Sequence, residues 1–298
     1  MQCQQSYTGE QEQRGVLYLV ATPIGHLQDI TLRALEVLKQ VDQIACEDTR
    51  QTRKLLHHFA IDTPCTSYHE HNRKKRGEEI LQLLQQGKQV ALVSDAGLPA
   101  ISDPGEELVS EAVRRGLAVI PIPGANAAVS ALIASALPTG SFLFCGFLPR
   151  GLKPMRKALD AVKDAPQTLV FYEAPHRLRT FLHVLREALG ERKVTLAREL
   201  TKLHEEFLRG SVSELIDWYT EREPRGEYTI VVAGSAALGV GAEEPWSLTV
   251  EEQVASYIDD GWSKKEAIQR VAELRRLPKR EVYNRYHAQP PEEADPLS

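Results

Sequence analysis

The sequence predicts an α/β fold with two α/β domains, followed by a small helical module near the C-terminal end. Short apolar and β-branched runs alternate with amphipathic stretches at helical spacing, which is typical of a mostly parallel sheet covered by helices. The chain has 298 residues, more than one core usually spans, so two cores are expected.

The first α/β domain is expected over residues 15–122. Strands are predicted at 16–21, 43–46, 89–94 and 118–122. Two apolar stripes at helical spacing lie between them, one capped by Thr31 and one around Ile80. Two prolines and a glycine at 121–124 fix the backbone where the pattern restarts, so we place the domain boundary there.

The second α/β domain is expected over residues 123–236. A small-residue helix is predicted first, and the strands follow at 141–147, 168–172, 194–198 and 228–233. The remaining segments are a disordered extension, a linker, a basic helical module and a disordered tail, at 1–14, 237–248, 249–288 and 289–298.

Composition narrows the classes of protein. No apolar run reaches the roughly 20 residues that a bilayer requires, and the N-terminal segment is polar, so a cytoplasmic protein without a membrane partner is expected. The four cysteines form no closely spaced pair and are interpreted as free thiols. A net charge of −5 argues against a protein that coats nucleic acid with its whole surface.

Local basic segments remain possible RNA contacts. Between Ser263 and His287, eight Lys or Arg stand against three Glu, opposite in sign to the whole chain. Ser263 and Pro278 suit helix starts, so a helix-turn-helix is one interpretation, and a solvated basic face is the other.

Two turns at strand ends are candidate ligand loops. The first, Thr22-Pro23-Ile24-Gly25, contains neither a Gly-x-Gly-x-x-Gly pattern nor a Walker lysine, so a ligand turn or a plain structural turn remain. The second, at 94–105, is long and rigidified by proline and glycine. Its acidic residues favour a hydroxyl-rich or cationic ligand over phosphate. Asp95 is the better ligand candidate, because Asp103 is equally suited to cap the following helix.

A third pair of segments combines acids, histidines and cations at 47–50 and 68–76. His69 and His71 project to one face of an extended segment, but no clear third ligand accompanies them, so no metal site is predicted. The cations beside an aromatic ring suit an RNA strand, with a base stacked on Tyr68, and a solvated charge run is the alternative. The candidate RNA contacts are Arg50, Tyr68, His71, Asn72, Arg73, Lys74, Lys75, Arg76 and Arg198.

These segments, together with 123–126 and 171–177, occur in an order that resembles the tetrapyrrole-methylase-like (class III) methyltransferases over residues 15–287. The chain is similar to members that methylate the ribose 2′-hydroxyl of a cytidine in the decoding region of 16S rRNA. One departure is His26, where the family usually has Asn. The resemblance implies a cofactor cleft between the two α/β domains and a homodimer acting on 16S rRNA, within the 30S subunit.

The resemblance also implies S-adenosylmethionine as the cofactor. The residues expected to contact it are Pro23, Ile24, Gly25, Asp95, Gly97, Ile101, Ser102, Tyr172 and Ile230. A ribose hydroxyl is a weak acid, so a base or hydrogen-bond acceptor is expected near it. Asp48, Glu173 and His69 are the candidates, with Asp48 as our first hypothesis. A small-molecule methyltransferase, for example for a tetrapyrrole, and a non-catalytic RNA-binding protein are the competing interpretations.

Overall fold

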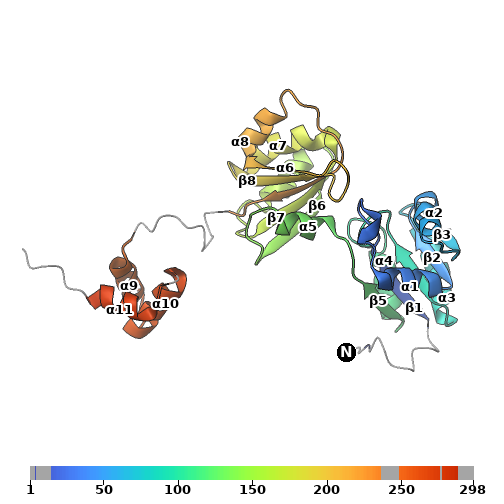
Figure 1. Ribbon diagram of the computed structural model, residues 1–298, viewed down its shortest axis with the longest axis horizontal. Coiled ribbons are helices and arrows are strands. Elements are labelled where there is room, and N and C mark those ends of the chain that lie inside the picture. The colour runs from blue at the N-terminus through green and yellow to red at the C-terminus, as the bar shows by residue number, and fades with distance from the viewer. Residues whose placement is uncertain (1–3, 5–14, 236–247, 276, 288–298) are drawn as a thin grey trace, which may run out of the picture. The chain divides into compact units, whose positions relative to one another are not determined.

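The computed structural model describes residues 4, 15–235, 248–275 and 277–287 (Figure 1). The expected extension 1–14, linker 237–248 and tail 289–298 lie outside these residues, apart from Gln4 and Leu248. Contacts divide the chain into two compact units, 1–239 and 240–298, and each is described by itself.

The first sheet of the larger unit is entirely parallel, with the strand order β3-β2-β4-β1-β5. Val90–Val93 reads Val-Ala-Leu-Val and is buried throughout, as expected of a central strand covered on both faces. Pro121 lies on the edge strand, where its missing N–H is tolerated. The strands are β1 (Val16–Val20), β2 (Gln43–Cys46), β3 (Cys65–Ser67), β4 (Val90–Val93) and β5 (Ala118–Ile122).

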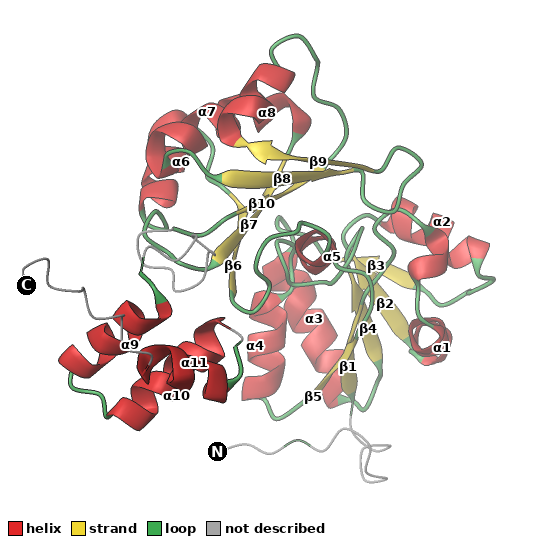
Figure 2. Ribbon diagram, turned by 60° about the vertical axis from the view of Figure 1, so that its left-hand side comes forward, coloured by secondary structure: helices red, strands yellow, loops and turns green. Residues whose placement is uncertain are grey.

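Helices cover both faces of this sheet (Figure 2). Ala34, Leu38 and Leu56 pack one pair of helices against one face, and Ile80 and Leu108 pack another pair against the other face. The first pair is α1 (Leu32–Gln40) and α2 (Thr49–His58), and the second is α3 (Arg73–Gln85) and α4 (Glu106–Arg114). A short 3₁₀ turn, η2 (Leu27–Asp29), precedes α1.

The second sheet is mixed, with the order β6-β7-β10-β8-β9. β6 and β7 pair in parallel, whereas β10 pairs antiparallel with β7 and β8, and β8 pairs antiparallel with β9. Its strands are β6 (Phe142–Phe147), β7 (Thr168–Glu173), β8 (Lys193–Arg198), β9 (Glu206–Ser211) and β10 (Tyr228–Val232). The main core lies under α6 (Leu152–Asp160), α7 (Pro175–Leu189) and α8 (Val212–Trp218), while α5 (Ala127–Ile133) packs on the other face.

The α/β class predicted from the sequence is confirmed, and every predicted strand has a counterpart. Two strands were not predicted. β3 has only three residues, and β9 carries Arg209 and Gly210, which interrupt the apolar pattern. The domain boundary at 122/123 stays a prediction.

The smaller unit contains α9 (Val250–Asp259), α10 (Lys264–Arg275) and α11 (Lys279–His287). Val254, Val271 and Val282 are fully buried and form its core. Thr249 caps α9 in a capping box with Glu252. No helix among the described residues is long and apolar enough to cross a membrane.

Candidate active site

The turn after β1 and the loop after β4 are joined backbone to backbone. The N–H of Thr22 donates to the Gly97 carbonyl at 2.9 Å, and the N–H of Gly97 donates to the Thr22 carbonyl at 3.0 Å. The Thr22 hydroxyl donates to the Ser94 carbonyl at 3.1 Å. β1 and β4 are adjacent parallel strands, so their carboxyl ends bring both loops to one edge of the sheet, where α/β proteins bind ligands.

Two glycines allow the backbones around this edge to approach closely. Gly97 has φ +82°, a conformation that side chains rarely adopt. A Cβ at Gly25 would lie 2.6 Å from Thr201 Oγ1 and 2.9 Å from the Leu200 carbonyl oxygen. Glycine at position 25 therefore lets the loop after β8 pack directly on the turn after β1.

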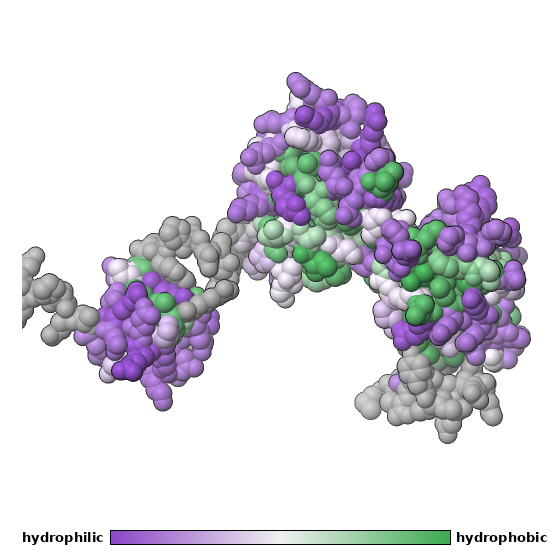
Figure 3. Space-filling view, in the orientation of Figure 1, coloured by the Kyte–Doolittle hydropathy of each residue, from purple (hydrophilic) through white to green (hydrophobic). Residues whose placement is uncertain are grey.

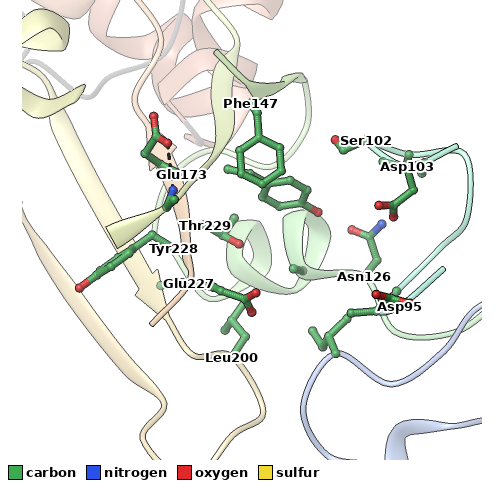
Figure 4. Close-up of a pocket in the computed structure, with 18 of the residues that line it drawn as sticks. Asp95, Ser102, Asp103, Asn126, Phe147, Glu173, Leu200, Glu227, Tyr228 and Thr229 are labelled. Carbon is green, nitrogen blue, oxygen red and sulfur yellow. Dashed lines mark hydrogen bonds between the residues drawn. The ribbon is translucent and has the colours of Figure 1, made fainter. Parts of the chain in front are cut away.

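A cavity of about 480 Å³ opens between these loops (Figure 4), within the usual size range of small-molecule sites. One side is formed by the loop after β4 and the start of α5, and the other by the ends of β7 and β8 and the start of β10. The lining residues that Figure 4 labels are Asp95, Ser102, Asp103, Asn126, Phe147, Glu173, Leu200, Glu227, Tyr228 and Thr229.

The first side of the cavity carries negative charge. Burial, together with the nearby carboxylates of Glu47 and Asp95, raises the pKa of Asp103 to about 6. Burial and Asp95 also raise the pKa of Glu47. Gly105 occupies the N-cap of α4. Asp103 is therefore not the cap of that helix, which was the alternative interpretation of this residue.

The other side is largely apolar and aromatic. Tyr172 packs against Phe144 and Phe147, with ring centroids 5.2 and 5.5 Å apart, and its hydroxyl accepts a hydrogen bond from the Ala128 N–H at 3.2 Å. Leu200 adds to this wall. A flat apolar ring with polar edges would be matched by such a surface.

Backbone strain gathers in the loops around the cavity. Four non-glycine residues there have positive φ: Ala100, Ser102, Glu199 and Thr201, at 65°, 62°, 51° and 65°. Such conformations cost about 1–3 kcal/mol each and cluster at functional sites. The strain supports a ligand site here.

Six of the nine predicted cofactor residues line the cavity: Ile24, Asp95, Gly97, Ile101, Ser102 and Tyr172. Pro23 and Gly25 belong to the supporting turn instead. Ile230 is fully buried in the core beneath the helices, and Thr229 faces the cavity. The structure therefore does not support a contact from the Ile230 side chain.

Glu173 is the one candidate acceptor among Asp48, Glu173 and His69 that lines the cavity. Its Oε1 accepts from the Ala174 N–H at 2.9 Å and lies 3.4 Å from Arg177 Nε. Its Oε2 is buried without a hydrogen-bond partner among the described residues. Burial raises the pKa of this carboxyl. An unpartnered buried carboxylate oxygen is costly, so its retention favours a role in binding or chemistry.

Asp48 has a different setting. It caps α2 by accepting from the Arg50 N–H at 2.8 Å, and its Oδ2 lies 2.7 Å from Arg50 Nη2. These bonds hold the pKa of Asp48 at about 2. A carboxylate so stabilised is a weak base. The third candidate, His69, receives a contact from the Asn72 amide at 3.2 Å.

Some of the predicted RNA contacts are buried or bonded within the chain, and others are exposed. Tyr68 is only 2% exposed, so its ring offers no face to a base, and the predicted stacking on it is wrong. Asn72 instead accepts from the His69 N–H at 2.9 Å. His71, Arg50, Lys74 and Lys75 are exposed.

The remaining cations are paired within the chain. Arg73 pairs with Glu70 and Glu107, Arg76 with Glu79, and Arg198 with Glu206. Lys74 and Lys75 make no ion pair among the described residues, and they lie in the first turn of α3. Cations there oppose the helix dipole, a local cost that an anionic partner would offset.

Several lining residues were not among the predicted site residues. Asn126 lies in the segment 123–126, which was part of the family resemblance but was not predicted to line the site. Its side chain caps α5 by accepting from the Val129 N–H at 2.9 Å, so an asparagine at this position also has a purely structural explanation. Lys202 bonds to Glu199 at 3.0 Å and Glu227 at 2.7 Å on the cavity wall. Nothing in their spacing indicates that positions 202 and 227 meet, because the contact depends on tertiary packing.

Comparison with known proteins decides the family. A sequence model of the Tetrapyrrole (Corrin/Porphyrin) Methylases matches residues 16–216. The chain belongs to the tetrapyrrole methylase family. It is therefore a methyltransferase that uses S-adenosylmethionine. Proteins named ribosomal RNA small subunit methyltransferase I are 54% identical in Halalkalibacterium halodurans and 52% in Bacillus subtilis, covering 96% and 95% of this chain and 99% and 98% of theirs.

Two solved methyltransferase structures show the same fold. A uroporphyrin-III-C-methyltransferase from Thermus thermophilus superposes with a TM-score of 0.53 at 23% identity, covering 74% of this chain and 94% of that one. Cobalt precorrin-4 methyltransferase has a TM-score of 0.57 at 17% identity, covering 76% and 97%. The two-sheet architecture is therefore shared with methylases of other substrates.

The cavity suits S-adenosylmethionine, which carries positive charge on its sulfonium and amino groups and has an aromatic adenine. Asp95 and Asp103 offer negative charge on one side, and Tyr172 and Leu200 offer apolar surface on the other. Burial is the main cause of the raised pKa of Asp103, and the carboxylates of Glu47 and Asp95 add to it, so a cation bound beside them would relieve the repulsion between the carboxylates.

His26, the departure from the family pattern, performs a cap in this turn. Its Nδ1 accepts from the Gln28 N–H at 3.2 Å, as a shorter Asn side chain does in an Asx turn. Its backbone N–H donates to Thr201 Oγ1 at 3.0 Å. His26 therefore stabilises this turn through both its ring and its backbone.

The close approach at Gly25 yields a testable prediction. Gly25→Ala forces the loop after β8 away from the turn, and overpacking of this kind costs roughly 1–3 kcal/mol. We expect the Kd for S-adenosylmethionine, measured by calorimetry, to rise roughly tenfold. Gly140→Ala is the control, since nothing lies within 4 Å of a Cβ there. If both variants bind S-adenosylmethionine as tightly as the unmodified protein, the close packing at Gly25 is not needed for cofactor binding.

The raised pKa of Asp103 predicts a pH-dependent stability. The carboxyl titrates at 3.8 when unfolded and about 6 when folded, so its ionisation favours unfolding as pH rises through that interval, and the penalty is complete above it. Without cofactor, Asp103→Asn should raise the free energy of unfolding at pH 8 by on the order of 1 kcal/mol. The gain should disappear by pH 4. Asp62→Asn, at an exposed position, is the control. If Asp103→Asn instead lowers the free energy of unfolding at pH 8, the pKa of Asp103 is not raised in the folded protein.

Proposed function

We propose that this methyltransferase transfers the methyl group of S-adenosylmethionine to the ribose 2′-hydroxyl of a cytidine in the decoding region of 16S rRNA. The relatives named ribosomal RNA small subunit methyltransferase I, at 54% and 52% identity over nearly the whole chain, are the observation that carries the proposal. The assembled 30S subunit is the proposed substrate, a homodimer the proposed state, and the cytoplasm the proposed location.

The bound cofactor supplies an electrophilic methyl group on a sulfonium. The chain's part is to hold donor and acceptor in line, and such positioning can supply several kcal/mol of the barrier. The strained loop containing Ala100 and Ser102, joined to the first turn through Thr22 and Gly97, suits this task because it is rigid.

Glu173 is the proposed acceptor for the ribose hydroxyl. Glu173 borders the cavity, and its Oε2 is buried without a hydrogen-bond partner among the described residues, while Ala174 and Arg177 hold Oε1 in place. Its side chain is fully buried on the sheet face that carries Phe171 and Ile230, so the carboxylate has to turn toward the cavity to accept from the ribose. The raised pKa makes this carboxylate a stronger base than an exposed glutamate, although it remains far weaker than the alkoxide it would assist. It therefore accepts a hydrogen bond, and takes the proton as the bond to the methyl group forms.

The contribution of Glu173 is tested by Glu173→Gln, which preserves shape and the bond from Ala174 but removes the charge. We expect kcat to fall roughly 10²–10⁴-fold with little change in cofactor affinity. The rate of the unmodified protein should rise with pH through the raised pKa of Glu173, and this rise should be absent in the variant. Asp48→Asn is the matched comparison and should keep most turnover. Loss of turnover in Asp48→Asn alone would return the role to Asp48.

Exposed Lys74 and Lys75 are the proposed phosphate contacts of the larger unit. Lys74→Ala/Lys75→Ala should weaken RNA binding and lower the slope of log K against log salt by roughly 1.5–2, because two phosphate contacts are lost. The kcat at saturating RNA should be unchanged. Lys163→Ala/Lys193→Ala removes the same charge from two other exposed positions. An equal effect of that pair would show a general charge effect instead.

The substrate itself is tested by labelled methyl transfer to 30S subunits and to free 16S rRNA, followed by mapping of the modified nucleotide. The proposal predicts a 2′-O-methylated cytidine, formed faster on 30S subunits. A methylated base would overturn the 2′-O assignment. Transfer to a tetrapyrrole but not to RNA would favour the competing function.

A further inference from the structure

The helical unit at 248–287 separates its charges between helices. α9 has four acidic residues over 250–260 and no Lys or Arg. The segment 263–287, which contains α10 and α11, has eight basic residues against three acidic ones. A unit needing only solubility would have both signs interspersed, whereas this one presents a basic pair of helices.

Each acidic residue of α10 and α11 is bonded to a residue close to it in the sequence. Glu266 accepts from the Ser263 N–H at 3.1 Å, Glu273 from the Gln269 amide at 3.1 Å, and Glu281 pairs with Arg285 at 2.5 Å. Lys265 and Arg280 are exposed and make no hydrogen bond or ion pair within the described residues. Their charges are available to an anionic partner.

One face of α11 has the side chains of a nucleic-acid surface. Arg280, Tyr283, Asn284 and His287 recur at helical spacing and are exposed, while Val282 on the other side is buried. Tyr283 is 52% exposed, and its ring stacks on His287 with centroids 4.1 Å apart. His287 Nδ1 lies 2.8 Å from the Tyr283 carbonyl. The visible face of the unit is mostly hydrophilic (Figure 3).

The methylase core does not need a segment of this size. The family model ends at residue 216. A ribosomal RNA small subunit methyltransferase I from Thermotoga maritima, 50% identical, matches 74% of this chain with 99% of its own length. About a quarter of this chain has no counterpart in that relative, and the helical unit lies beyond the family model, so we assign it no part in the chemistry.

We propose that the exposed face of α11, with Lys265 of α10, binds phosphates and riboses of rRNA outside the methylated nucleotide. This inference rests on the proposed function and names a second contact with the same substrate. The major groove of an RNA helix is too narrow for side-chain readout, so the contacts are to backbone and ribose and are independent of sequence. The negative charge of α9 orients the unit, because it repels the same backbone.

The test uses the full chain. Lys265→Gln/Arg280→Gln removes two charges and keeps the aliphatic stems. The Kd for 16S rRNA should rise roughly tenfold at moderate salt, and the salt slope should fall by about 1.5–2. The Kd for S-adenosylmethionine and the kcat at saturating RNA should be unchanged. Lys163→Gln/Lys193→Gln in the larger unit is the charge-matched control.

The aromatic pair is tested separately. Tyr283→Ala should weaken RNA binding several-fold, and Tyr283→Phe should restore it, because the ring and its stacking remain. Circular dichroism and Tm matching the unmodified protein establish that each variant is folded. The inference is overturned if the double Gln variant binds RNA within twofold of the unmodified protein, or if the control pair weakens binding equally.

Failure of this inference is distinguishable from failure of the proposed function. If the unmodified chain methylates 16S rRNA and the variants at positions 265, 280 and 283 do so with unchanged Kd and KM, only the second contact is refuted. If the unmodified chain transfers no methyl group to RNA, the proposed function fails and this inference with it.

Discussion

The packing of the Gly25 turn against the loop after β8 is the contact on which the site depends. It brings the carboxyl edge of the first sheet against the end of the second, and the cavity lies between them. Thr22 and Gly97 tie the turn to the loop after β4 by two backbone bonds. A short chain of backbone contacts thus holds one side of the cavity in fixed relation to the other, as a reaction that depends on alignment requires.

The electrostatics of the cavity follow from the same packing. Burial, together with the clustering of Glu47, Asp95 and Asp103, raises the pKa of Asp103 and of Glu47. Carboxylates placed this close together repel one another and destabilise the unliganded protein. A bound cationic ligand would relieve this repulsion and would therefore bind more tightly. The opposite side has Glu173, whose buried Oε2 is unpartnered within the described chain. The two sides therefore differ in chemistry: the first is acidic, and the second is largely apolar and aromatic.

The fold and much of the cavity lining could be predicted from the sequence because both follow local patterns. Strands such as Val90–Val93 are recognisable from composition, and the loop at 94–105 is marked by proline, glycine and acids. Burial was not predictable, since Tyr68 resembles a stacking residue by type and is in fact 2% exposed. The sequence also does not show which face of a strand points to the cavity. Thr229 lines the cavity, whereas the neighbouring Ile230 points to the opposite face and packs in the core. Lys202 and Glu227 meet only through tertiary packing.

We propose that the carboxylate-lined cavity between the two sheets binds S-adenosylmethionine. The most direct measurement is calorimetric titration of the full chain with S-adenosylmethionine across pH 5–8. We expect one site per chain, with an affinity for S-adenosylmethionine that increases as pH rises through about 6, where Asp103 ionises. Absence of binding, or an affinity independent of pH in this interval, would contradict this proposal.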